Sequence, residues 1–128
     1  MKFEIPYPPT KKGKAAWNKR FGLNAYYSGK HWSARKRDAE ELHTLAILCM
    51  KKAGIENEIF EKPVCITFLF NDGLDCSNHA AIVKMIEDAM KTRVIKDDGP
   101  KYVRSITVGF HEKDCITVIV REAQNEGY

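Results

Sequence analysis

Short segments of apolar residues mark the predicted strands. Residues 64–70, VCITFLF, are apolar on both faces and rich in β-branched and aromatic side chains, which predicts a central strand. Residues 102–110 and 115–123, YVRSITVGF and CITVIVREA, alternate in hydrophobicity and predict a hairpin with a four-residue connection. Residues 2–6, KFEIP, predict a short strand that ends at Pro6.

Two longer segments have apolar residues at the spacing of a helix. Ser33 is a favourable N-cap, and the run after it predicts a helix that stops near Gly54. A second helix is predicted from about Asn78 to Thr92. At about 100° per residue, this helix has a polar ridge that contains Lys84 opposite a buried stripe. The stripe consists of Ile82, Met85, Ile86 and Ala89.

Residues 10–31 show no sustained period. They combine three glycines with lysines and scattered aromatic residues, and Pro8 and Pro9 before them force an extended path. We expect a long basic loop here, and a loop of this length in a compact domain usually has a function or is mobile. Residues 123–128 are polar and are expected to form a frayed tail.

The predicted elements follow the order β-α-β-α-β-β. This order favours an α+β fold, in which a mixed β-sheet packs against two main helices. The chain has 128 residues, 44% of them hydrophobic, which suits a single domain over residues 1–128. The first residues lack the apolar block of a secretory signal, and no apolar run approaches the roughly 20 residues that cross a bilayer. We therefore expect a cytoplasmic protein with no membrane partner.

The net charge of +4 is unevenly distributed. Residues 1–40 carry ten Lys or Arg and three Asp or Glu, a balance of +7, whereas residues 41–128 carry eleven and fourteen, a balance of −3. This division is expected when a basic segment binds a polyanion and the remainder holds cations. The alternative is an uneven surface charge without a function.

Acidic residues stand at both ends of the second predicted helix. Asp72 and Asp75 precede it, and Asp97 and Asp98 follow it. A helix of about 15 residues is roughly 22 Å long, so these carboxylates converge only if the chain folds back after Arg93. Apolar residues directly after Arg93 could anchor that return. Converging carboxylates would suit a hard cation such as Mg²⁺. Otherwise Asp75 is a helix cap and the later pair belongs to an ordinary turn.

Cysteine usage indicates neither a disulfide framework nor a complete zinc site. The four cysteines form no Cys-x-x-Cys pair, and three of them lie within apolar runs. Cys76 and His79 have the spacing of half a zinc site, but no second half with suitable spacing follows.

Several of these motifs together resemble one family. The opening FEIPYPPTKK, the run DCSN at 75–78, Lys84 before Glu-Asp-Ala, and Ile-x-Asp-Asp at 95–98 are similar to motifs of the RusA-like Holliday junction resolvases. These are small endonucleases of bacteria and their phages. The family pattern is an Asp-x-Asp-Asn run, a helix with a Lys before Asp-Ala, and a terminal Asp-Asp. The resemblance covers roughly residues 3–120.

The resemblance implies a function and a set of site residues. It implies a homodimeric endodeoxyribonuclease that depends on Mg²⁺, with Mn²⁺ as a substitute, and makes paired nicks across a four-way DNA junction in recombination and repair. Asp75 would be a metal ligand, and Asn78 would close the first run. Lys84 would offset charge at the scissile phosphate. Asp97 and Asp98 would be the paired aspartates, with at least one of them a metal ligand.

The chain departs from the family pattern at Ser77, which stands where the second aspartate of the run is expected. A hydroxyl is a poorer Mg²⁺ ligand than a carboxylate, so Asp72 or water would have to replace it. Ser77 is alternatively the N-cap of the second helix. Lys84 also follows Asn78 by six residues, a wider gap than in the simplest family pattern. Two further hypotheses therefore stay open: a catalytically weakened protein that binds branched DNA, and a plain interaction domain.

The basic segment supplies candidate DNA contacts under the first two hypotheses. Cationic side chains would pair with phosphates independently of sequence, and aromatic side chains would stack on a splayed base. The cations are Lys11, Lys12, Lys14, Lys19, Arg20 and Lys30. The aromatic candidates are Trp17, Tyr26, Tyr27 and Trp32, of which Tyr27 and Trp32 are preferred. The alternative is that at least two of these aromatic residues pack onto the core.

Overall fold

The computed structural model describes residues 1–24 and 29–124. Its four strands are β1 (Lys2–Pro6), β2 (Val64–Phe70), β3 (Val103–Phe110) and β4 (Cys115–Glu122), and they form one sheet in the order β1-β4-β2-β3. β4 runs antiparallel to both of its neighbours, and β3 runs parallel to β2. The predicted α+β fold with a mixed sheet is therefore confirmed.

The predicted pairing of the last two strands is wrong, although both strands exist. β2 lies between β3 and β4, so the two do not form a hairpin. The connection passes over the end of β2, where the Asn71 side-chain amide donates to the carbonyls of Glu112 (3.3 Å) and Lys113 (3.1 Å). Two strand spacings of about 5 Å each lie within reach of four extended residues.

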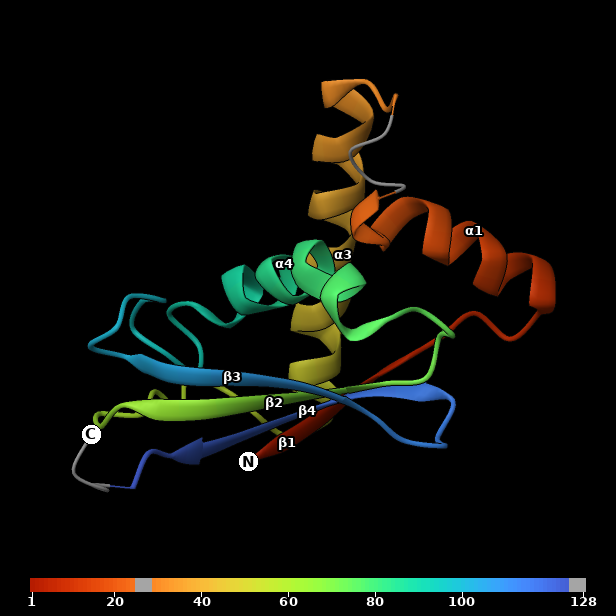
Figure 1. Cartoon of the computed structure of the whole chain (residues 1–128). Helices are drawn as coiled ribbons and strands as arrows, with labels where there is room; N and C mark the ends of the chain where they lie inside the picture. The colour runs from red at the N-terminus through yellow and green to blue at the C-terminus, as the bar shows by residue number, and fades with distance from the viewer. Residues whose placement is uncertain (25–28, 125–128) are drawn as a thin grey trace.

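The helices lie together on one face of the sheet (Figure 1). In the part of the chain that the structure describes they are α1 (Lys11–Phe21), α3 (Trp32–Lys52) and α4 (Ala80–Met90), with a short 3₁₀ helix, η1 (Cys76–His79), directly before α4. Alternate residues of β2 are buried beneath them, as a central strand requires. The first half of α3 projects beyond α4 (Figure 1). Among the described residues no helix is both long and apolar enough to cross a membrane.

The predicted loop over residues 10–31 is wrong for residues 11–21, which form α1. Thr10 is the N-cap, and its hydroxyl accepts from the Gly13 N–H at 2.9 Å. Trp17 and Phe21, four residues apart, are both buried with ring centroids 4.7 Å apart. Only these two aromatic residues anchor a helix rich in lysine, so the apolar period was too sparse to predict it.

Several helix boundaries differ from the prediction. α3 begins at Trp32, and His31 rather than Ser33 is its N-cap, with Nδ1 accepting from the Ser33 N–H at 3.2 Å. The second predicted helix is divided into η1 and α4 and ends at Met90, two residues early. β4 ends at Glu122, and of the predicted tail, residues 125–128 lie outside the described residues.

Candidate functional site

The chain reverses direction directly after α4. Thr92 adopts φ = 66°, and its N–H donates to the Ile95 carbonyl at 2.6 Å. Val94 and Ile95 are only 0% and 1% exposed, so they anchor the returning chain in the core. This reversal places Asp97 and Asp98 beside the exposed ridge of α4.

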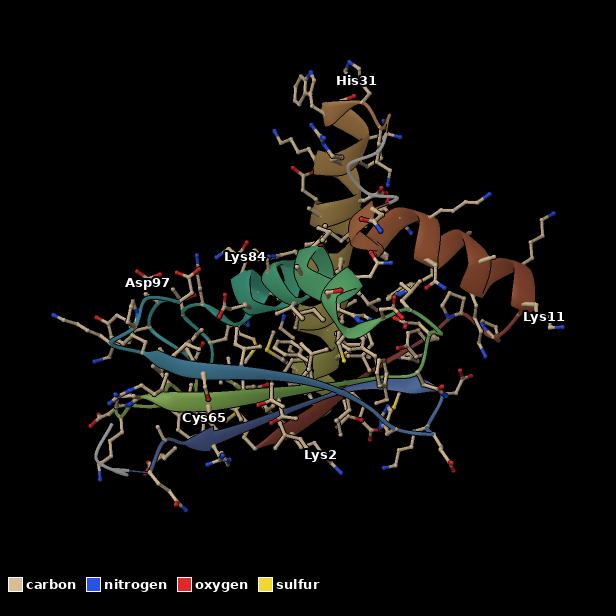
Figure 2. The ribbon with its side chains drawn as sticks, viewed as in Figure 1. Lys2, Lys11, His31, Cys65, Lys84 and Asp97 are labelled. Atoms are coloured by element: carbon tan, nitrogen blue, oxygen red, sulfur yellow. The ribbon has the colours of Figure 1, made fainter. Side chains whose placement is uncertain are left out.

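Six charged residues meet at this ridge, and we call them the Lys84 cluster. Lys84, Glu87 and Asp88 belong to α4, and Lys91 follows it directly. Asp97 and Asp98 lie on the returning loop. Figure 2 shows Lys84 on the helix and Asp97 on the loop after it. Of these, Glu87, Asp88 and Lys91 had not been assigned to a site. Helical spacing could have predicted Asp88 and Lys91, because these residues fall on the same face of the predicted helix as Lys84.

Lysines bridge the carboxylates of the cluster. The Lys84 ammonium hydrogen-bonds the Asp98 carboxylate and lies 3.3 Å from Asp88 Oδ1. The Lys91 ammonium lies 3.1 Å from both Asp88 Oδ1 and Asp98 Oδ2, and 4.0 Å from Asp97 Oδ1. Asp97 Oδ1 in turn accepts from the Asp98 N–H at 2.8 Å. The Asp98 side chain thus holds the returning loop against helix α4.

These contacts shift the pKa values of several residues of the cluster. Hydrogen bonds from Lys84 and then Lys91 hold the pKa of Asp98 far below its usual range. The same hydrogen bond, which Lys84 donates to Asp98, raises the pKa of Lys84. Burial raises the pKa of Glu87, and the nearby Lys84 opposes that shift. Four carboxylates and two ammonium groups leave a formal charge of −2, which favours a divalent cation.

The donor chemistry of the cluster suits Mg²⁺, which prefers carboxylate oxygens. Asp97, Asp98 and Asp88 are the residues that would hold the ion. Both lysines compete for the same oxygens, so the ion would have to displace at least one of them from Asp98. Within residues 1–24 and 29–124, no three His, Cys, Asp or Glu side chains are already gathered closely enough to hold a metal.

Asp75 lies apart from the Lys84 cluster. It occupies the N-cap position of η1, is exposed, and makes no capping bond through its side chain. Nine positions along η1 and α4 separate it from Lys84, up to roughly 15 Å along the helical path. The structure therefore brings Asp97 and Asp98 to Lys84 but leaves Asp75 at the far end of the helical segment.

Ser77 and Asn78 lie within η1. Ser77 is exposed and is not an N-cap, which corrects that alternative, because the N-cap position of α4 belongs to His79. The Asn78 side-chain oxygen accepts from the Asn24 N–H at 3.0 Å. Asn78 therefore ties η1 to the segment that follows α1.

Asp72 makes buried hydrogen-bond contacts with His79 that the sequence did not predict. His79 Nε2 lies 2.7 and 2.9 Å from the two carboxylate oxygens of Asp72, and Nδ1 lies 3.2 Å from the Cys76 carbonyl. The two side chains are only 1% and 5% exposed. Both ring nitrogens of His79 are thus engaged, which leaves none to bind zinc together with Cys76.

The predicted DNA-binding cations fall into two groups. Lys11, Lys12 and Lys19 are exposed on α1, and Lys11 lies at the end of α1 farthest from α3 (Figure 2). The others make ion pairs within the protein, as the following contacts show. Arg20 and Lys30 both bind Asp38, at 2.9 and 2.6 Å; Arg20 also binds Glu41; and Lys14 lies 2.8 Å from Asp114.

The aromatic candidates also divide. Trp17 is buried against Tyr7 and Phe21, so for this residue the alternative of packing onto the core is confirmed. Trp32 is 62% exposed at the start of α3. Tyr26 and Tyr27 lie outside the described residues.

Comparisons with known proteins do not assign the chain to a family. No protein-family model matches it, and no curated protein matches it significantly. The proposal below therefore depends on the site geometry and on the resemblance of individual motifs.

Proposed function

We propose that the protein is a cytoplasmic, Mg²⁺-dependent endodeoxyribonuclease that resolves four-way junctions or other branched DNA by paired phosphodiester hydrolysis. One observation carries this proposal: the chain reversal after α4 places Asp98 in contact with Lys84. These two residues match the paired aspartates and the lysine of the RusA-like motif pattern. Their approach in space is what a shared catalytic site requires.

Each residue of the site would have a distinct role. Asp97, Asp98 and Asp88 would hold Mg²⁺, with Asp75 as a further ligand if bound DNA or a second copy of the chain brings η1 closer. The bound ion would activate water and stabilise charge on the phosphodiester. Lys84 would then face the scissile phosphate, because an Asp98 carboxylate that held the ion would no longer be its closest partner. Asp72 is better suited to supporting η1 through His79 than to binding the ion.

DNA binding would use the cations that remain exposed. Lys11, Lys12 and Lys19 would pair with phosphates, and the exposed Trp32 would stack on a base at the branch point. Paired nicks on opposite strands need two active sites, so a homodimer would be the working form.

A catalytically weakened protein that binds branched DNA is the second candidate. Two observations favour it. Ser77 supplies no charge where the family has an aspartate, and Asp75 lies away from the Lys84 cluster. Such a protein would bind junctions without cutting them.

The test is cleavage of a synthetic four-way junction in Mg²⁺. Asp98→Asn and Asp75→Asn should each lower the cleavage rate by more than about a hundredfold, because each removes a carboxylate that would hold the Mg²⁺ ion whose charge stabilises the transition state. Junction binding, measured in Ca²⁺, should change little. Glu58→Gln, which removes an exposed carboxylate outside the Lys84 cluster, is the matched control and should cut at the normal rate.

The results separate the two candidates. Normal cleavage by both aspartate variants would exclude the proposed metal site. A wild type that binds junctions but nicks nothing in Mg²⁺ or Mn²⁺ would favour the second candidate. Ser77→Asp should then restore cleavage.

A further inference from the structure

One edge of the sheet is long and exposed. β3 stands last in the strand order, so none of the described strands pairs with its outer side. Ile106 and Phe110 of β3 are 40% and 54% exposed, although both are large and apolar. The opposite edge, β1, is short, begins with Lys2 and ends at Pro6, and these features hinder pairing with another chain. β3 has eight residues and contains neither lysine nor proline, so it lacks that protection.

The backbone of β3 presents hydrogen-bonding groups along this edge. The His111 N–H donates to the Phe70 carbonyl at 3.1 Å, so it points toward β2. Successive residues of a strand direct their backbone groups to opposite sides. The N–H groups and carbonyls of the even-numbered residues between 106 and 110 therefore point away from β2. Among the described residues the Val108 carbonyl makes one long contact, 3.7 Å from Cys76 Sγ. These groups can therefore pair with a further strand.

The side chains along this edge are complementary to those of the same strand in a second copy of the chain. Residues directly opposite each other in an antiparallel pair lie on the same face of the sheet. A twofold axis through Val108 places Ile106 opposite Phe110 of the second copy. The same axis brings Arg104 level with Glu112, an exposed residue of opposite charge just beyond the strand. Apolar side chains thus meet at the centre, and opposite charges meet at both ends.

We infer that β3 pairs antiparallel with β3 of a second copy, about a twofold axis at Val108. The pairing joins two four-stranded sheets into one sheet and forms roughly six backbone hydrogen bonds. The neighbouring register, with the axis at Thr107, is less favourable, because it sets Phe110 opposite Arg104. The inference does not depend on nuclease activity, since it rests on the strand edge alone. It provides the interface that the proposed homodimer needs.

Proline at position 108 tests the pairing without disturbing β2. Val108→Pro removes an N–H that points away from β2, so the sheet within each copy keeps its hydrogen bonds. In sedimentation experiments the wild type should be a dimer. Val108→Pro should raise the dissociation constant of the dimer about a hundredfold, because two intermolecular hydrogen bonds are lost. Thermal unfolding checks that the variant folds.

Two lysine substitutions form a matched pair. Phe110 and Leu48 are exposed to almost the same extent, 54% and 56%, but Leu48 lies on α3. Phe110→Lys should weaken the dimer at least about tenfold, because it removes an apolar contact at the proposed interface and adds a charge there. Leu48→Lys should leave the dimer unchanged. Equal effects of the two substitutions would overturn the inference.

Disulfide cross-linking tests the register. The Cα atoms of two opposed Val108 residues would be about 5.5 Å apart, so Val108→Cys should form a disulfide between copies under mild oxidation. Two Thr107 residues would be out of step by two positions and farther apart than the roughly 7 Å that a disulfide spans, so Thr107→Cys should not. Both variants carry Cys76→Ser, because that thiol lies near Val108. Cross-linking at 107 but not at 108 would overturn the proposed axis.

The edge inference and the nuclease proposal can fail separately. A monomeric wild type, or a dimer of unchanged strength in Val108→Pro and Phe110→Lys, would overturn the edge inference. If that wild type still cuts junctions, the nuclease proposal stands. A wild type that dimerises through β3 but cuts no junction in Mg²⁺ or Mn²⁺ would overturn the nuclease proposal and support the edge inference.

Discussion

The buried contact between Asp72 and His79 changes the role of a residue that the sequence marks only as acidic. Its carboxylate is held by His79 and also accepts from the Leu74 N–H at 3.0 Å. The His79 ring stacks on Phe70 with centroids 3.9 Å apart. The segment that carries Asp75 and Asn78 is therefore fixed at both of its ends. Side chains seven positions apart meet here through a turn, which neither helical nor strand periodicity can predict.

Replacing His79 tests this pair. His79→Phe keeps a ring on Phe70 but leaves the Asp72 carboxylate buried without a partner, so the free energy of unfolding in urea should fall by about 3 kcal/mol. His43→Phe, a change of the same type at a half-buried position of α3, should cost much less. Adding Asp72→Asn to His79→Phe should recover part of the loss, because no charge then remains buried. A double variant no more stable than His79→Phe would contradict the buried charge.

Lys84 and the aspartates after α4 could be predicted individually, because helical spacing assigned Lys84 to a polar ridge. Their contact could not be derived, because it depends on the conformation of Thr92. The sequence also could not predict that Lys84 and Lys91 both contact the Asp98 carboxylate. It follows from the rotation of α4 together with the path of the loop.

Strand positions were predictable, whereas strand partners were not. The alternation of apolar residues depends on burial of one face and is local to each strand. Pairing instead depends on which edge is free when the sheet assembles, and here β4 inserts between β1 and β2. A short connection favours a hairpin, and the carbonyl contacts of Asn71 show how four residues pass over β2 instead. Helix α1 was not predicted for a different reason, because only two of its residues, both aromatic, are buried.

The backbone of the chain reversal after α4 is strained at Thr92, and this strain can be tested. Thr92 is β-branched and adopts φ = 66°, a region that β-branched residues rarely occupy. Thr92→Asn should raise the free energy of unfolding by about 0.5–1 kcal/mol, because Asn tolerates this conformation better. Thermal and urea unfolding measure the change. Thr44→Asn, in the regular helix α3, should give no gain, and an equal gain there would exclude relief of strain as the cause.

The basic residues of the N-terminal region fall into two structural groups: some make ion pairs within the protein, and others are exposed. Part of the basic N-terminal region holds the fold together, because Arg20 and Lys30 clamp Asp38 and so join α1 to α3. The Lys30 ammonium also donates to the Arg20 carbonyl, near the end of α1, at 3.2 Å. The exposed lysines of α1 are those available to a polyanion. Net charge along the sequence counts both groups equally, so it could indicate a polyanion partner but not the residues that contact it.

The salt dependence of the proposed DNA binding should separate these two groups. Lys12→Gln should make the slope of log affinity against log salt less steep by about 0.9, because one phosphate contact is lost, and should not alter stability. Arg20→Gln should leave the slope unchanged and lower the melting temperature. Fluorescence anisotropy at a series of KCl concentrations gives the slope. Lys62→Gln, at an exposed position before β2, is the control, and the same change of slope there would indicate non-specific attraction.

The position of β4 in the sheet determines when the protein can fold during synthesis. Of the four described strands β1 is made first, but the strand it pairs with is β4, which is made last of the four. The Met1 ammonium donates to the Val120 carbonyl at 3.2 Å across 119 positions, so the two ends of the fold close on each other. A nascent chain that lacks β4 leaves the inner edges of β1 and β2 unpaired and open to other chains. The sheet is therefore expected to assemble cooperatively, and only after β4 has left the ribosome.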